Sequence, residues 1–201
     1  MVEETNPIKG GKIAIVGAGP VGLVLSILLS EKGFHVDLFE KRTLADFQSP
    51  PDRVLGTTLT QRGQVALKAA GLTDENFGIR LLSMQVHLPR SSGDYTFLIG
   101  RQGDLFYSLS RSELLHLLLA KTEKLGTKLH WGSSVKGVDP ESGKLVWEQD
   151  GEEKENQYEA IFGADGVYSS IRRHLEELKK VTSTIETCEL GYLYMYIPPK
   201  D

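Results

Sequence analysis

A glycine-rich turn between an apolar strand and a helix constrains the fold of this chain more than any other feature. The sequence GAGPVG begins at Gly17, directly after the β-branched run Lys12–Val16. It leads into the apolar stretch Pro20–Lys32, which Gly33 ends, and His35–Phe39 follows as a second strand-like run. A strand, one crossover helix and a second strand within about thirty residues form a βαβ unit, whose two strands are parallel.

The spacing of the three glycines predicts a dinucleotide site. Gly17 allows the tight turn, Gly19 lets a pyrophosphate approach the backbone, and Gly22 lets the helix pack closely on the strand. The helix N-terminus presents free N–H groups and the positive end of its dipole to the phosphates. Glu40 ends the second strand and is expected to accept hydrogen bonds from ribose hydroxyls. A tight turn without a ligand is the alternative, and the flanking strand, helix and acidic residue favour dinucleotide binding.

The residues after Glu40 bear on the choice of cofactor. A carboxylate at this position repels a 2′-phosphate, which argues against NADP at this site. Lys41 and Arg42 follow in the sequence LFEKR. Arg42 would pair with a phosphate or stack on adenine, which is more typical of flavoproteins than of NAD dehydrogenases. A solvated loop cation is the alternative for Arg42.

The composition excludes several other classes of protein. The 201 residues are 40% hydrophobic and 25% charged, as in ordinary globular chains that bury a core without metal or disulfides. Cys188 is a single cysteine, and the five histidines lack metal-site spacing, so we expect no disulfide and no metal site. The net charge of −4 favours neither nucleic acid nor an anionic membrane. The polar N-terminus resembles no targeting peptide and Val21–Leu29 is too short to span a bilayer, so we expect a cytoplasmic chain without a membrane segment.

The remaining pattern predicts alternating helices and strands. Apolar periodicity and capping residues indicate helices, and short apolar runs between turn residues indicate strands. The predicted helices are Gln61–Ala70, Arg111–Lys124 with Ser110 and Glu113 as a capping box, and Tyr168–Lys179. The predicted strands are three antiparallel pieces between Leu81 and Leu109, four pieces in LHW, SVKGV, KLVWEQ and YEAIFGAD, and a last one at Gly191–Ile197. Thr43–Gly56 reads as a loop, and the acidic run from Asp150 to Glu155 as a solvated hairpin turn.

A second motif, IFGADGVYSSIR at Ile161–Arg172, combines a strand, a turn carrying Asp165 and a helix started by Ser169 or Ser170. The turn can place Asp165 against a ribose or a water-bridged phosphate of FAD, and a simple helix-capping role is the alternative. Together with the glycine-rich turn, this motif resembles the FAD-dependent aromatic hydroxylases, the single-component flavoprotein monooxygenases. The β-meander predicted from Val135 to Gln149 resembles the crossover connection of that family.

The resemblance implies an α/β fold: a Rossmann-type FAD-binding fold with a β-meander crossover and the start of an antiparallel substrate sheet. Within the family, the kynurenine 3-monooxygenases are most similar. The segments that carry this similarity are Asp52–Leu72, Tyr107–Leu119, Gly163–Leu175 and Gly191–Asp201. By resemblance, residues 1–180 form the FAD-binding domain, with antiparallel strands of the substrate region inserted at about 79–109. Residues 181–201 would begin a truncated substrate domain.

The resemblance also implies a set of cofactor-binding residues, among them a flavin-contacting arginine at Arg111. The whole set is Gly17, Gly19, Val21, Gly22, Phe39, Glu40, Lys41, Arg42, Thr58, Arg111, Val135, Asp165 and Ser170. No acid–base catalytic residue is nominated, because in this family the chemistry belongs to the cofactor.

The substrate-binding residues stay open. The family holds the amino-acid carboxylate of its substrate with an arginine and a tyrosine, and Met84 and Ile99 occupy those positions here. A carboxylate buried without a charged partner is costly, so kynurenine itself does not follow from the resemblance. The substitutes available after a register shift are Arg80, Arg90, Tyr95 and Arg101.

By resemblance, the expected function is an FAD-dependent, NAD(P)H-using monooxygenase that hydroxylates a small, kynurenine-like aromatic substrate with molecular oxygen. Family members are much longer, and their second flavin motif would follow Asp201, so the chain reads as an amino-terminal half. A longer form with a carboxy-terminal anchor would belong to the mitochondrial outer membrane. The alternative is a truncated dinucleotide-binding module without turnover. A third reading, an NAD-dependent dehydrogenase, is disfavoured by the Asp165 motif and by the lack of a placed acid–base residue.

Overall fold

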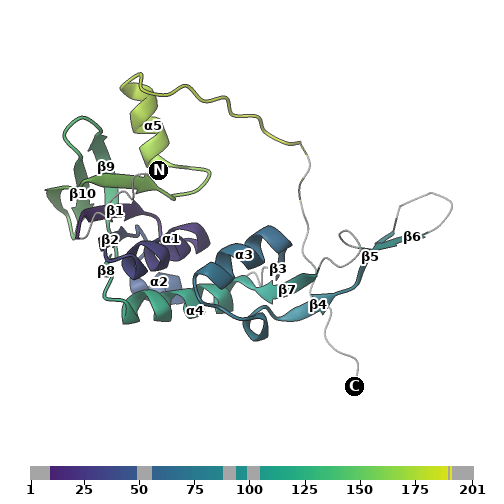
Figure 1. Cartoon of the computed structure of the whole chain (residues 1–201). Helices are drawn as coiled ribbons and strands as arrows, with labels where there is room; N and C mark the ends of the chain where they lie inside the picture. Colours follow the sequence, from purple (N-terminus) through teal and green to yellow (C-terminus); the bar gives the residue numbers. More distant parts are fainter. Residues whose placement is uncertain (1–9, 49–55, 88–93, 99–104, 190, 192–201) are drawn as a thin grey trace, which may run out of the picture.

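A parallel sheet organises the computed structural model, which describes residues 10–48, 56–87, 94–98, 105–189 and 191 (Figure 1). The strand order is β12-β1-β2-β8, and every neighbouring pair is parallel. These strands span Lys12–Val16 (β1), His35–Phe39 (β2), Lys128–His130 (β8) and Ala160–Gly163 (β12). The two central strands, β1 and β2, are buried almost throughout, as expected when both faces of a parallel sheet are covered.

Helices α1 (Pro20–Glu31) and α4 (Arg111–Lys124) cover one face of this sheet and pack against each other. Their apolar side chains, such as Leu23 and Leu118, are fully buried against β1 and β2. Ser110 caps α4 as predicted, because its Oγ accepts a hydrogen bond from the Glu113 N–H at 3.4 Å. Among the helices in the described ranges, none has the length and apolar character needed to cross a membrane.

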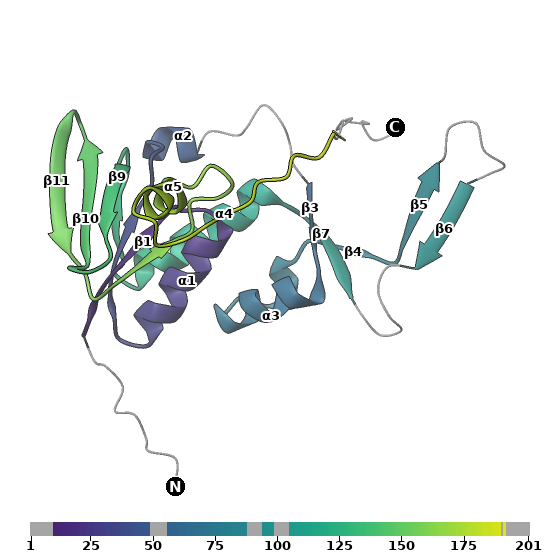
Figure 2. The ribbon, with the colours of Figure 1, turned by 90° about the horizontal axis from the view of Figure 1, so that it is seen from above.

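An antiparallel meander covers the opposite face, where Figure 2 shows it across the sheet from α1 and α4. Its strands are β9 (Ser134–Asp139), β10 (Lys144–Gln149) and β11 (Glu152–Gln157), in the order β11-β10-β9. Leu145 and Trp147 bury their side chains against the sheet. Helix α5 (Ser170–Glu177) packs on β9 and contributes the buried Ile171. The predicted meander crossover is therefore confirmed.

One correction concerns the acidic run, which was predicted to be a hairpin turn. Only Asp150 and Gly151 form the turn, and Glu152–Gln157 is the third strand of the meander, so the meander is longer than Val135–Gln149. The strand lies at the sheet edge and is mostly exposed, which explains why it needs no apolar residue. Backbone pairing with β10 and the Lys144–Glu155 ion pair at 2.6 Å hold it in place.

A second, antiparallel region lies beside the parallel sheet and contains the predicted strands before α4. Its sheet has the order β3-β7-β4, and a separate hairpin joins β5 to β6. The elements are β3 (Gly56–Leu59), α3 (Gln61–Ala69), the short 3-10 helix Asp74–Asn76, β4 (Ile79–Leu81), β5 (Ser83–His87), β6 (Asp94–Leu98) and β7 (Phe106–Ser110). Strand β3 was not anticipated. The predicted strand Gly191–Ile197 lies, beyond Gly191, outside the described residues.

A second correction concerns Thr43–Gly56, which was predicted to be a loop throughout. Leu44–Gln48 forms the short helix α2. Thr43 and Asp46 start it with reciprocal bonds: Asp46 N–H donates to Thr43 Oγ1 at 3.1 Å, and Thr43 Oγ1 donates to Asp46 Oδ2 at 2.7 Å. The buried ring of Phe47 then anchors the helix on the core.

A buried carboxylate joins the meander side to the parallel sheet. Asp37 of β2 accepts a hydrogen bond from the Tyr158 hydroxyl at 2.7 Å, and Lys12 Nζ lies 3.5 Å away. Burial alone would raise the pKa of Asp37. The His130 imidazole at 3.6 Å, the Tyr158 hydroxyl and the Lys12 ammonium outweigh burial and lower that pKa to about 2. The same burial and the Asp37 charge raise the pKa of Tyr158, which therefore stays a hydrogen-bond donor.

Leu118→Ala is expected to lower the free energy of unfolding by about 3 kcal/mol, because the side chain is fully buried between α4 and the sheet. Its neighbour Leu117 is 42% exposed, so Leu117→Ala should cost less than about 1 kcal/mol. Urea unfolding followed by circular dichroism measures both. Equal losses in the two variants would contradict the packing of α4 described above.

Asp37→Asn is expected to lower the free energy of unfolding at neutral pH by about 2 kcal/mol, since folding lowers the pKa of Asp37 from 3.8 to about 2. A carboxylate with a lowered folded-state pKa stabilises the protein above its unfolded-state pKa. The contribution is lost as the pH falls from about 4 to about 2. Urea titrations should therefore show the variant and the wild type converging over this interval. Glu123→Gln, at an exposed carboxylate of α4, is the control, and a wild-type advantage that did not shrink would refute the assignment.

Candidate functional site

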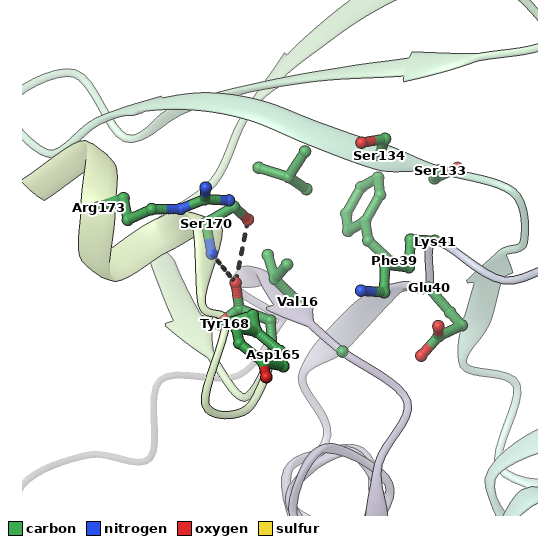
Figure 3. A pocket seen from close by; sticks show the side chains of 12 residues that line it. Val16, Phe39, Glu40, Lys41, Ser133, Ser134, Asp165, Tyr168, Ser170 and Arg173 are labelled. Atoms are coloured by element: carbon green, nitrogen blue, oxygen red, sulfur yellow. Dashed lines mark hydrogen bonds between the residues drawn. The ribbon is translucent and has the colours of Figure 1, made fainter. Parts of the chain in front are cut away.

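A pocket of about 280 Å³ lies where the strands of the parallel sheet end (Figure 3). The chain enters β1 first, places β2 on one side of it, and returns to place β12 on the other side. Such a reversal of strand order opens a crevice at the carboxyl ends of the strands. The residues that line the pocket are Val16, Gly17, Phe39, Glu40, Lys41, Ser133, Ser134, Val135, Asp165, Tyr168, Ser170 and Arg173.

The glycine-rich turn closes one end of this site. Its three glycines differ in what a side chain would meet at each position. Gly17 has φ +106°, and a Cβ there would lie 2.5 Å from the carbonyl oxygen of Ala164. A Cβ at Gly22 would collide with the carbonyl oxygen of Gly17. Gly19 has an ordinary φ of −75°, and a Cβ there would meet no atom within 4 Å. Packing within the chain therefore explains Gly17 and Gly22, and it leaves open space in front of Gly19.

The N-terminus of α1 faces the same turn. Pro20 is its first residue and has no N–H, and the first intrahelical bond runs from the Leu23 N–H to the Gly19 carbonyl at 3.0 Å. The N–H groups of Val21 and Gly22 precede that bond, as the first donors of a helix do. The Val21 side chain is 70% exposed beside them. This end of α1 can therefore donate hydrogen bonds to a phosphate.

Glu40 ties the end of β2 to the glycine-rich turn. Its Oε2 accepts a hydrogen bond from the Ala18 N–H at 2.9 Å. The backbone N–H and Nε of Arg42 donate to Oε1 at 3.0 and 2.9 Å, and Nη2 of Arg42 donates to Oε2 at 3.2 Å. Burial would raise the pKa of Glu40, but these hydrogen bonds and the Arg42 charge outweigh burial and lower it. The carboxylate is therefore ionised at neutral pH.

The three residues next to Glu40, namely Phe39, Lys41 and Arg42, differ in whether they line the pocket. Phe39 and Lys41 line the pocket, and the Phe39 ring stacks on His130 with centroids 4.4 Å apart. Arg42 is outside the pocket lining, and its guanidinium lies 4.8 Å from the centre of the Phe47 ring. Arg42 thus holds Glu40 in place in this structure, and its predicted contact with phosphate or adenine stays a prediction.

Asp165 lines the pocket and also starts α5. Its carboxylate accepts from Ser169 Oγ at 2.6 Å, from the Ser170 N–H and Oγ at 2.6 and 3.0 Å, and from the Ile171 N–H at 3.2 Å. Burial would raise the pKa of Asp165, and the hydrogen bonds from Ser169, Ile171 and Ser170 outweigh it and lower the pKa. Ser169 is the N-cap and accepts from the Arg172 N–H at 3.0 Å. The capping role considered for Asp165 is therefore present.

The other predicted cofactor residues are divided between two places. Val135 and Ser170 line the pocket. Thr58 lies in β3 and Arg111 opens α4; both are exposed and neither lines the pocket. Of the two substrate positions, Met84 pairs with Phe97 in the β5–β6 hairpin, and Ile99 lies outside the described residues.

Sequence reasoning missed four polar residues that line the pocket: Ser133, Ser134, Tyr168 and Arg173. Ser133 and Ser134 follow β8, and Tyr168 follows β12. Because parallel strands end at the same edge of a sheet, residues just after any of these strands belong to one site. That rule could have found the two serines and Tyr168. Arg173 lies on the second turn of α5, and no sequence signal singled it out.

Comparisons with known proteins agree with this geometry. Residues 11–195 match the FAD binding domain family. The kynurenine 3-monooxygenase of Stenotrophomonas maltophilia is 29% identical over 197 residues, covering 94% of this chain and 43% of the relative. That of Sus scrofa is 30% identical over 205 residues, covering 98% and 43%. The crystal structure of 2-methyl-3-hydroxypyridine-5-carboxylic acid oxygenase has a TM-score of 0.67 and 26% identity, covering 83% and 42%.

The chain therefore spans less than half the length of these relatives. The match to the FAD binding domain nevertheless includes the glycine-rich turn, Glu40, the meander and the Asp165 turn. The Rossmann-type fold predicted from the sequence is confirmed. The chain belongs to the FAD binding domain family and is similar to relatives named kynurenine 3-monooxygenase.

Proposed function

We propose that the pocket at the strand ends binds the adenosine half of FAD, with the pyrophosphate in front of Gly19. The observation that carries this proposal is the open space at Gly19, because no contact within the chain explains the glycine there. A phosphate in that space would meet the N–H groups that begin α1. The pocket of about 280 Å³ is just below the range of about 300–1,000 Å³ for ligand sites, which suits a nucleoside better than a whole dinucleotide.

Glu40 would bind the ribose, and its existing hydrogen bonds limit how a ribose hydroxyl could reach the carboxylate. A carboxylate has about four lone-pair positions, and the bonds from Ala18 and Arg42 already use four. A ribose hydroxyl must therefore replace one of these donors. The Nη2 bond of Arg42, at 3.2 Å, is the longest of them, so the hydroxyl would replace it at the smallest cost. The backbone bonds from Ala18 and Arg42 can then stay and keep the carboxylate aimed at the pocket.

For the whole protein we propose an NAD(P)H-using hydroxylase of a small aromatic substrate. FAD, when bound, supplies the redox chemistry by which such enzymes combine a nicotinamide donor, molecular oxygen and an aromatic ring. The described residues bind and orient the cofactor. Residues 1–180 would form the FAD-binding domain, with the antiparallel strands at about 79–109 and residues 181–201 belonging to the substrate region. The support is the similarity to enzymes named kynurenine 3-monooxygenase.

A second candidate is an FAD-binding module without turnover of its own. It is favoured by the small size of the pocket, about 280 Å³. After FAD has been added and excess removed, oxygen consumption with NADPH or NADH and kynurenine separates the two candidates. Consumption that needs the nicotinamide and FAD supports the hydroxylase. Retained FAD without oxygen consumption supports the module.

Gly19→Ala is expected to raise the Kd for FAD at least about tenfold while leaving the free energy of unfolding within about 0.5 kcal/mol of wild type. The φ of −75° suits alanine, and the new methyl group would meet nothing in the chain, only the proposed pyrophosphate. Gly22→Ala is the matched comparison, and it should destabilise the fold because its Cβ would collide with the Gly17 carbonyl. Flavin fluorescence titration and urea unfolding measure the two effects. Unchanged FAD binding in Gly19→Ala would refute the proposed phosphate position.

A further inference from the structure

Arg173 is a pocket residue whose guanidinium has no partner among the residues that the structure describes. It lies on the second turn of α5, and Figure 3 shows its side chain reaching from the helix toward the pocket, opposite Phe39 and Ser134. Neither a hydrogen bond nor an ion pair within 4.0 Å engages its side chain in that part of the chain. The preceding residue, Arg172, contrasts with it, because Nη2 of Arg172 donates to the Val167 carbonyl at 3.0 Å and its Nε lies 4.0 Å from Glu176.

Neither carboxylate that lines the pocket, Glu40 or Asp165, forms an ion pair with Arg173. Arg42 neutralises Glu40, and the N-terminal donors of α5 bind the carboxylate of Asp165. The cations Lys41 and Arg173 line the pocket on opposite sides. The two cations would attract an anionic nucleotide to this site.

The position of Arg173 indicates which part of the nucleotide it would contact. The pocket is lined by the residues after β2 and β8 and the start of β9, whereas Gly19 and the N-terminus of α1 are outside its lining. If the pyrophosphate lies at Gly19 and the ribose at Glu40, the space between Val135 and Arg173 is left for the base. A guanidinium is planar and can lie flat on an aromatic face, whereas an ammonium is a compact charge that lacks this stacking contact.

We propose that Arg173 is a cofactor-binding residue that covers a face of the adenine ring of FAD. The inference rests on the proposed FAD site and adds a contact from α5 to it. Arg173 then takes the role that the sequence LFEKR had suggested for Arg42, and Arg42 acts as the positioning residue for Glu40. The base is thus held between a helix and the end of the sheet.

The test measures binding of FAD, ADP and FMN to the wild-type chain, Arg173→Ala, Arg173→Lys and a control. The control is Lys136→Gln, which removes an exposed cation of β9 that pairs with Glu148 outside this pocket. We expect Arg173→Ala to raise the Kd for FAD and for ADP by a similar factor of about ten. Arg173→Lys should recover little of this loss, and Lys136→Gln should bind as wild type does. Binding of FMN, which has no adenine, should not change in any variant.

The outcomes separate this inference from the proposed function. A wild-type chain that binds neither FAD nor ADP would overturn both. A wild-type chain that binds FAD, with an Arg173→Ala variant that binds it equally well, would overturn the contact and leave the FAD site standing. Full recovery in Arg173→Lys would overturn stacking, because it would show that charge alone is needed. A loss for FAD without a loss for ADP would also overturn the adenine contact.

Discussion

The close approach of α1 to the end of β1 is the constraint on which the site depends. At Gly22 the helix comes so near the Gly17 carbonyl that no side chain fits between them. This contact fixes the helix N-terminus beside the ends of β1 and β12 and brings Ala18 to Glu40. The same packing buries Leu23 and Ile27 against the sheet. The six residues Gly17–Gly22 therefore determine both how α1 packs on the sheet and the open space at Gly19, where we propose that the phosphate binds.

The sequence predicts best what is local and constrained by backbone geometry. The helix α4 begins at Arg111 and ends at Lys124 as predicted, because Ser110 caps it and its apolar period is regular. The glycine-rich turn and the Asp165 turn are where their motifs placed them. Both are specified by residues close in sequence, whose spacing carries the structural information.

What the sequence did not predict depends on neighbours far along the chain. Strand β11 has no apolar alternation, and only pairing with β10 makes it a strand. Whether the Arg42 side chain lies in the pocket or against the Phe47 ring depends on α2, the helix that follows it in the sequence, and on how the intervening loop folds back. Arg173 enters the pocket because α5 packs on β9, a contact between elements that their separate patterns cannot show.

Different parts of the fold would bind the cofactor and the substrate, which explains why the sequence predicts cofactor residues in more detail than substrate contacts. The proposed cofactor site lies at the ends of β1 and β2, which are largely buried, so its residues are held in register by the core. Of the two substrate positions of the family, Met84 falls in the β5–β6 hairpin, where it pairs with Phe97 and where Tyr95 pairs with Val86. In a two-stranded hairpin, a shift of one residue exchanges the faces of the ribbon. Similarity in sequence therefore predicts residues at the strand ends, such as Glu40 and Asp165, more directly than the substrate contacts, which depend on the register of one hairpin.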